Sequence, residues 1–107
     1  MIKIAIADDN LLLQQSIHEK MDFFGDVTVA FKAVDGEDLL EKLEQNRNVD
    51  LILMDIEMPK MNGIQATEAV KNNYPHIKII MLTVFDNDEN IFNAIMAGAD
   101  GYLLKDL

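Results

Sequence analysis

The chain contains no cysteine, which excludes disulfide bridges and thiolate metal sites. No apolar run approaches the roughly 18–20 residues of a membrane-spanning helix, and Met1-Ile2-Lys3-Ile4 lacks the pattern of a signal peptide. Basic residues are few, with 9 Lys and Arg against 19 Asp and Glu, so the formal net charge is −10. So acidic a chain repels phosphate backbones. We therefore expect a cytoplasmic chain that contacts no membrane and does not itself bind nucleic acid.

The residues that are present suffice for one packed domain. Half of the 107 residues are hydrophobic, and a chain of this length buries roughly 60–70% of its unfolded surface when it folds. We expect residues 1–107 to form a single domain whose core needs no cross-link.

Strands and helices are expected to alternate along the chain. Short apolar segments predict strands, and apolar residues at helical spacing predict helices. The expected strands are 2–7, 27–34, 49–54, 77–82 and 101–104, and the expected helices are 12–24, 39–46, 63–73 and 88–97. This alternation predicts an α/β fold with a parallel, doubly wound sheet of five strands. Because the strands are almost continuously apolar, we expect helices on both faces of the sheet.

Four of the five expected strands end on polar or charged residues. The first is followed by Asp8 and Asp9, the third by Asp55, the fourth by Thr83 and the fifth by Lys105. In open α/β sheets, ligands bind beyond the carboxyl ends of the strands. We therefore expect these side chains to share one rim, with Asp55 as the residue on which function depends.

Three carboxylates at one rim repel each other unless a cation or a proton joins them. Mg²⁺ fits because it takes oxygen ligands, needs only a few carboxylates and keeps water and phosphate oxygens. His18 and His76 are expected away from the rim, so no zinc or copper site is predicted. A carboxylate can also attack phosphorus and form an aspartyl-phosphate. Mg²⁺, the Lys105 ammonium and the Thr83 hydroxyl would then each meet one phosphoryl oxygen.

Taken singly, each of these residues has an ordinary explanation. An aspartate after a strand is commonly a helix N-cap, which would account for Asp8 or Asp9. Thr83 alone would be a turn residue, Lys105 a solvated surface lysine and Glu57 a loop acid. The joint arrangement, rather than any one residue, carries the prediction.

The arrangement resembles the receiver domain of bacterial two-component response regulators. The resemblance covers the whole chain and implies a flavodoxin-like sheet in the order 2-1-3-4-5. It also implies a phosphorylation-activated switch that assists its own phosphorylation and dephosphorylation and is otherwise not an enzyme. The matching motifs are Asp8-Asp9, Asp55 followed by Met58-Pro59 and Gly63, Thr83, and Lys105.

The resemblance implies a role for each matched acid. Asp55 would accept a phosphoryl group from a sensor histidine kinase or a small phosphodonor. Asp8, Asp9, Asp55 and the backbone carbonyl of Glu57 would form the Mg²⁺ site. Because this set contains no histidine or cysteine ligand, oxygen atoms alone would hold the metal.

The resemblance also implies a switch and an output. Thr83 and Lys105 would contact the phosphoryl group, and Thr83 with Tyr102 would change the surface formed by the fourth helix and the fifth strand. The segments 82–86 and 97–106 are most similar to receivers attached to a LuxR-type helix-turn-helix domain. This implies control of transcription through an output domain; the alternative is a stand-alone receiver that acts through protein contacts.

Two residues depart from the family pattern beside the expected site. Val84 follows Thr83 where a small residue is common, so we expect narrower access to Asp55 and slower phosphotransfer and hydrolysis. Asp106 follows Lys105 where a cis-proline is common. A cis bond before a non-proline residue is costly, so we expect a trans or strained peptide there.

Two other functional classes fit the fold. A haloacid-dehalogenase-like phosphatase also forms an aspartyl-phosphate, but it needs a second aspartate two positions after the nucleophile, where this chain has Glu57, and its nucleophile follows the first strand. A flavin-binding domain needs Ser, Thr and Gly around a phosphate, where this chain has Asp8-Asp9-Asn10. Turnover of phosphate esters or a yellow colour of the purified protein would support these alternatives.

The sequence stops at Leu107, where the family's fifth helix should begin. We expect that the receiver domain is truncated here before its last helix, with self-association across the bare face as a homodimer as the second explanation. We expect the sheet face that this helix covers to expose apolar surface, of the kind that marks an interface or an aggregation risk. The chain should therefore have a lower melting temperature, or a higher oligomeric state, than the same chain extended by a further helix. Equal melting temperatures and monomeric sedimentation of both would contradict this expectation.

Overall fold

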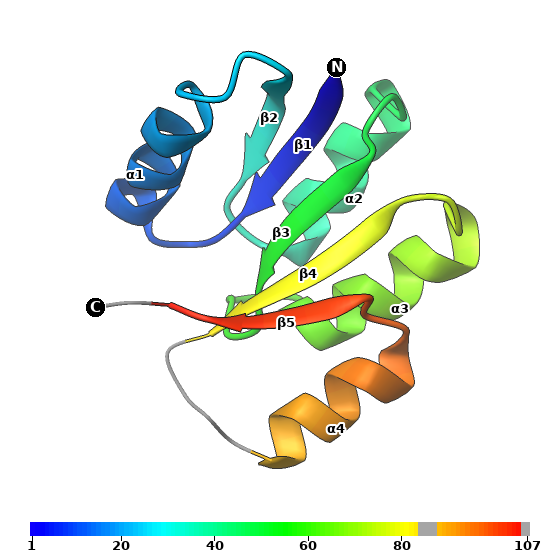
Figure 1. Cartoon of the computed structure of the whole chain (residues 1–107). Helices are drawn as coiled ribbons and strands as arrows, with labels where there is room; N and C mark the ends of the chain where they lie inside the picture. Colours follow the sequence, from blue (N-terminus) through cyan, green and yellow to red (C-terminus); the bar gives the residue numbers. More distant parts are fainter. Residues whose placement is uncertain (84–87, 106–107) are drawn as a thin grey trace.

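The computed structural model describes residues 1–83 and 88–105. Within them, strands and helices alternate along the chain (Figure 1). The strands are β1 (Ile2–Ala7), β2 (Val27–Ala33), β3 (Leu51–Asp55), β4 (Lys78–Thr83) and β5 (Gly101–Leu104). The helices are α1 (Leu11–Met21), α2 (Gly36–Gln45), α3 (Gly63–Asn73) and α4 (Asp88–Ala97). No helix in this part of the chain is long and apolar enough to cross a membrane.

The strands form one sheet in the order β2-β1-β3-β4-β5, and every neighbouring pair is parallel. The predicted fold class and strand order are therefore confirmed. Figure 1 shows α1 on one face of the sheet and α2, α3 and α4 on the other. The strand order reverses between β1 and β3, and the crevice beyond the carboxyl ends of such strands is where α/β sheets bind ligands.

The main core lies between the sheet and helices α2 to α4. Successive residues of a strand point to opposite faces, and on this face Ile52, Met54, Ile79 and Met81 have no exposed surface. Burying each of these side chains contributes roughly 1.5–3 kcal/mol relative to leaving it in water. The helices contribute the core residues Leu39, Leu43, Ala66, Val70 and Ala94.

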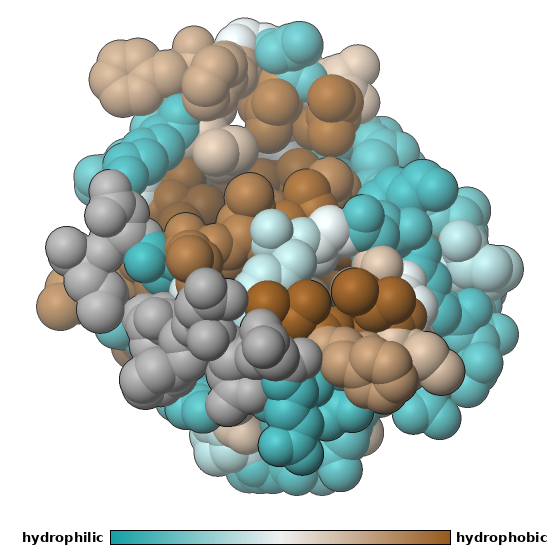
Figure 2. All heavy atoms as spheres, turned by 60° about the horizontal axis from the view of Figure 1, so that its bottom comes forward, coloured by the Kyte–Doolittle hydropathy of each residue, from teal (hydrophilic) through white to brown (hydrophobic). Residues whose placement is uncertain are grey.

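The opposite face of the sheet is only partly covered. Leu53 and Ile80 are half-buried there, and Leu103 of β5 is 55% exposed. α1 packs beside β2, so within the described residues no helix lies over the β4 and β5 part of this face (Figure 1). Figure 2, turned so that the α4 side comes forward, shows apolar side chains gathered across the visible surface. The expected exposed apolar surface is present, and the expectation of helices over both faces holds only in part.

α1 ends earlier than its apolar spacing predicts. It stops at Met21, where the backbone N–H of Phe24 donates to the Met21 carbonyl and the chain turns toward β2. Because of this turn Phe24 is 55% exposed, and Leu12, on the solvent side of the helix, is 85% exposed. The expectation that this helix continues to residue 24 is therefore wrong. The buried residue of α1 is instead Gln14.

Three helices begin with a capping side chain near the carboxyl rim of the sheet. The side chains of Asn10, Asp35 and Asn62 each accept a hydrogen bond from a backbone N–H in the first turn of α1, α2 and α3. The side chain of Gln65 accepts a hydrogen bond from the Asn62 N–H and completes a capping box. Caps of this kind satisfy donors that a helix start leaves open, and they fix where each loop leaves the rim.

Gly63 allows α3 to begin directly against the strand that carries Asp55. The N–H of Gly63 donates to the carbonyl of Ile56 at 2.8 Å. A Cβ at this position would overlap the backbone carbonyl oxygen of Asp55. Because the obstacle is main chain, no side-chain rotation can relieve the overlap.

Replacing Gly63 by alanine should therefore destabilise the domain, by about 1–3 kcal/mol or more, the usual cost of overpacking. Urea unfolding of Gly63→Ala measures this loss. Gly25→Ala is the matched control, because a Cβ at Gly25 would have no neighbour within 4 Å. Equal loss of stability in the two variants would contradict the role assigned to Gly63.

Candidate functional site

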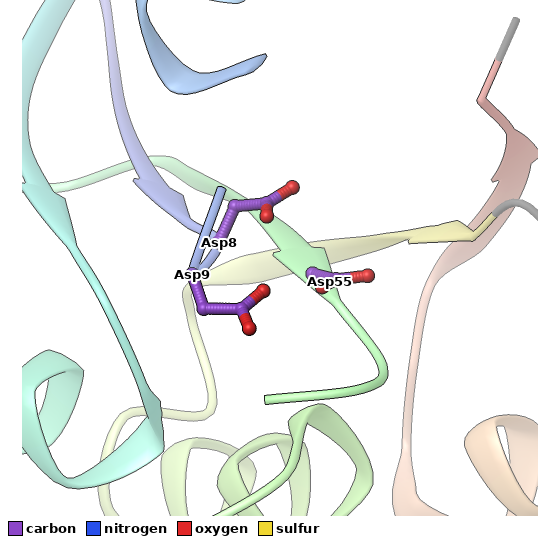
Figure 3. Close-up of side chains that lie close together, drawn as sticks. All are labelled: Asp8, Asp9 and Asp55. Carbon is purple, nitrogen blue, oxygen red and sulfur yellow. The ribbon is translucent and has the colours of Figure 1, made fainter. Parts of the chain in front are cut away.

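Three carboxyl groups meet at the carboxyl ends of β1 and β3. Asp55 is the last residue of β3 and Asp8 directly follows β1; both are buried, whereas Asp9 is exposed. One oxygen from each of the three lies within 4.8 Å of the others. Figure 3 shows their carboxyl groups extending to the same side of the strand ends. The strand order brings Asp8 and Asp55 together although they are far apart in the sequence.

Lys105 joins two of these acids. Its Nζ lies 2.8 Å from Asp8 Oδ2 and 3.0 Å from Asp55 Oδ1, and only 9% of its side chain is exposed. The backbone N–H of Lys105 also donates to the carbonyl of Thr83 at 2.6 Å. The lysine that follows β5 is therefore held against β4 by its main chain and against β1 and β3 by its side chain.

The acids and the lysine line one small pocket. Its volume is about 240 Å³, which suits a metal ion or a phosphoryl group rather than a large organic ligand. Thr83 contributes a buried side chain at the end of β4. The lining residues are Asp8, Asp9, Asn10, Asp55, Glu57, Thr83 and Lys105.

Burial sets the protonation of this pocket. It raises the pKa of Asp55 to about 6 from the ordinary 3.8. The hydrogen bond and positive charge of Lys105 oppose this rise, and the negative charges of Asp8 and Asp9 add to it. For Lys105 burial alone would lower the pKa, but the hydrogen bonds and charges of Asp8 and Asp55 raise it overall. Lys105 is therefore a cation at neutral pH.

The donor set suits a hard divalent cation. The three carboxylates offer only oxygen, and the open side at Asp9 leaves room for water or phosphate oxygens, as Mg²⁺ requires. Neither histidine lines the pocket: His18 Nε2 lies 3.7 Å from Asp22, and His76 is exposed. This placement agrees with the expectation that the histidines lie away from the rim.

Two of the predicted site residues are not found in the pocket. Tyr102 lies nearby without lining it, and Val84 lies outside the described residues. Tyr102 of β5 is half-buried, is paired with Met81 of β4, and packs against the core beside α4. It borders a separate pocket of about 190 Å³. Val84 and the peptide bond between Lys105 and Asp106 fall on residues that the structure does not describe, so both expectations stay predictions.

Two residues near the site were not singled out from the sequence. Asn10 lines the pocket and caps α1, and a polar residue just before an apolar helical run is a recognisable cap signal. Gln14 is buried and donates to the carbonyl of Asp8, but it gives no such signal, because nothing in the sequence separates it from the exposed Gln15 beside it.

The chain matches known receivers in sequence. Residues 4–107 match the family described as the response regulator receiver domain. The chain is 41% identical over 105 residues to the uncharacterized transcriptional regulatory protein YxjL of Bacillus subtilis (strain 168), covering 98% of this chain and 48% of that protein. It is 36% identical over 106 residues to the transcriptional regulatory protein DegU of Brevibacillus brevis, covering 99% and 44%. The chain thus spans about half the length of these curated relatives.

The fold is also similar to that of a solved receiver domain. The signal receiver domain of the putative response regulator NarL from Mycobacterium tuberculosis superposes with a TM-score of 0.91 at 28% sequence identity, covering 99% of this chain and 85% of that one. The match of residues 4–107 and the shared strand order agree with the geometry of the acidic pocket. This chain belongs to the response regulator receiver domain family.

Proposed function

We propose that this domain is a phosphorylation switch whose phosphoacceptor is Asp55. The observation that carries the proposal is the ion pair of a buried Asp55 with Lys105, in a pocket that also holds Asp8 and Asp9. An oxygen of the Asp55 carboxylate attacks phosphorus, the bond from phosphorus to the donor breaks, and the donor keeps its electron pair. The product is an aspartyl-phosphate.

We propose Mg²⁺ as the cofactor, held by Asp8, Asp9, Asp55 and the backbone carbonyl of Glu57. When bound, it would supply positive charge to a phosphoryl oxygen. The residues of the chain prepare for the same charge. Lys105 is a cation in the pocket, and Thr83 places a hydroxyl on its wall, so each can meet a further phosphoryl oxygen.

The proposed switch connects the pocket with the edge of the sheet. Phosphorylation replaces a carboxylate by a group with about −1.5 to −2 charges. Thr83 and Lys105 would respond first, and their backbones are already joined at the ends of β4 and β5. Tyr102 lies three residues before Lys105 on β5 and packs beside α4. A change at Thr83 would therefore alter the surface of α4 and β5.

The rest of the pathway is inferred from the relatives. Receiver domains of two-component systems interact with sensor kinases, and we propose a sensor histidine kinase as the phosphoryl donor. YxjL and DegU are named as transcriptional regulatory proteins, which supports an output domain of the LuxR type. We further propose a cytoplasmic location and, because the domain is so acidic, DNA contact only through the output domain. A homodimer through the open sheet face around Leu103 is a further proposal.

Replacing Asp55 by asparagine should abolish Mg²⁺-dependent labelling. The amide cannot act as the nucleophile, so incubation with a small acyl phosphate should give no mass increase of one phosphoryl group, as measured by intact-protein mass spectrometry. The matched control is Asp26→Asn, which removes one exposed acid far from the pocket and should label as the parent chain does. Full labelling of Asp55→Asn would overturn the assignment.

The stability of the metal-free domain should depend on pH through Asp55. Its pKa in the folded chain, about 6, lies above the ordinary 3.8, so protonation favours the folded state. That contribution is complete below about pH 4 and is lost as the pH rises through 6. Near pH 7.5 the ionised carboxyl should therefore destabilise the fold, and Asp55→Asn should be more stable than the parent by up to about 3 kcal/mol.

Urea unfolding of both proteins in a chelator, between pH 4 and pH 7.5, measures this difference. The advantage of Asp55→Asn should shrink toward pH 4. The control Asp26→Asn should differ from the parent by a nearly constant amount across the range. An advantage of Asp55→Asn that is the same at every pH would contradict the raised pKa.

A further inference from the structure

The side chain of Gln14 is buried, and its amide group donates hydrogen bonds to the main chain next to the acidic pocket. Only 5% of the residue is exposed. Its Nε2 donates two hydrogen bonds, one to the carbonyl oxygen of Asp8 at 2.6 Å and one to the carbonyl oxygen of Ala33 at 2.7 Å. One side chain of α1 therefore holds the ends of both β1 and β2.

The two accepting carbonyls lie where the chain leaves the sheet. Asp8 follows β1, and its backbone N–H donates to the same Ala33 carbonyl at 3.0 Å. Its side chain is fixed as well, since Oδ1 accepts from the N–H of Asn10 at 2.9 Å and Oδ2 accepts from Lys105. The Gln14 amide adds a hold on the peptide that leads from Asp8 into Asp9.

This peptide determines where both acids point. Asp9 is exposed, and its direction depends on the backbone between Asp8 and the start of α1. Gln14 sits in the first turns of α1, so its side chain connects the helix that begins after the acids with the strand that ends before them. Groups that orient metal ligands from behind typically change metal affinity 10–100-fold when they are removed.

We propose that Gln14 is a positioning residue for the cation site: its amide fixes the Asp8-Asp9 turn in the geometry that binds Mg²⁺. This inference rests on the proposed function, because it takes the acids of the pocket as the metal ligands. It adds a residue that does not itself touch the cation. The amide acts by holding the Asp8 carbonyl, and so the carboxylates on either side of that peptide.

The test is the variant Gln14→Met, which keeps a long unbranched side chain and removes both donors. The matched control is Gln15→Met, since Gln15 is exposed and its amide reaches only Glu19 and Lys32. Mg²⁺ is titrated into each folded protein, and the Kd is taken from the backbone amide shifts of Asp9 and Asn10. Urea unfolding in a chelator gives the stability of the same proteins without metal.

We expect the Kd for Mg²⁺ to rise on the order of tenfold in Gln14→Met and to stay within twofold of the parent in Gln15→Met. A lower stability of Gln14→Met with an unchanged Kd would overturn the proposal, because it would show a purely structural role. Absence of any Mg²⁺-dependent shift in the parent chain would overturn the proposed function itself. The two failures are thus distinguished within one experiment.

A measurement on the parent chain decides the case if Gln14→Met does not fold. The side-chain amide resonances of Gln14 should be protected from solvent exchange and should move during the Mg²⁺ titration with the Kd of the Asp9 amide. Those of Gln15 should exchange freely and stay in place. Gln14 resonances that do not respond while the Asp9 amide does would overturn the proposal.

Discussion

The ammonium group of Lys105 is the interaction on which the pocket depends. Without it, Asp8 and Asp55 would be two buried carboxylates with no positive partner, an arrangement that costs several kcal/mol per ion. With it, the ends of β1, β3 and β5 are tied together by one charge. The pKa of Asp55 is nevertheless raised, because burial outweighs the hydrogen bond and charge of Lys105. Additional positive charge in the pocket would therefore stabilise the ionised Asp55.

The pocket was predictable because it follows from topology. Asp8, Asp9, Asp55, Thr83 and Lys105 all follow strands of one parallel sheet, and a rule about strand ends suffices to bring them together. The sequence also named the family, which supplied the strand order. The match of residues 4–107 to receiver domains leaves the phosphatase and flavin alternatives without support.

Packing on the helices was less predictable. Leu12 and Phe24 have the spacing of a buried helical face but lie in water, whereas the polar Gln14 is buried between them in the chain. Hydrophobic spacing identifies a helix but does not show where it ends or which polar group will find two carbonyls to bind. The coverage of the sheet is similar: apolar strands predict buried faces, and only the placed helices show that Leu103 remains half in solvent.

The two neighbouring acids of the pocket differ in a way that would affect exchange of the proposed cation with solvent. Asp8 is buried, and its carboxylate accepts hydrogen bonds from Lys105 and from the backbone N–H of Asn10, whereas Asp9 is exposed. The proposed cation would therefore meet Asp9 first, where water can stay bound to it, and the enclosed acids second. Among the described residues, Asp9 would thus be the acid through which the proposed cation exchanges with solvent.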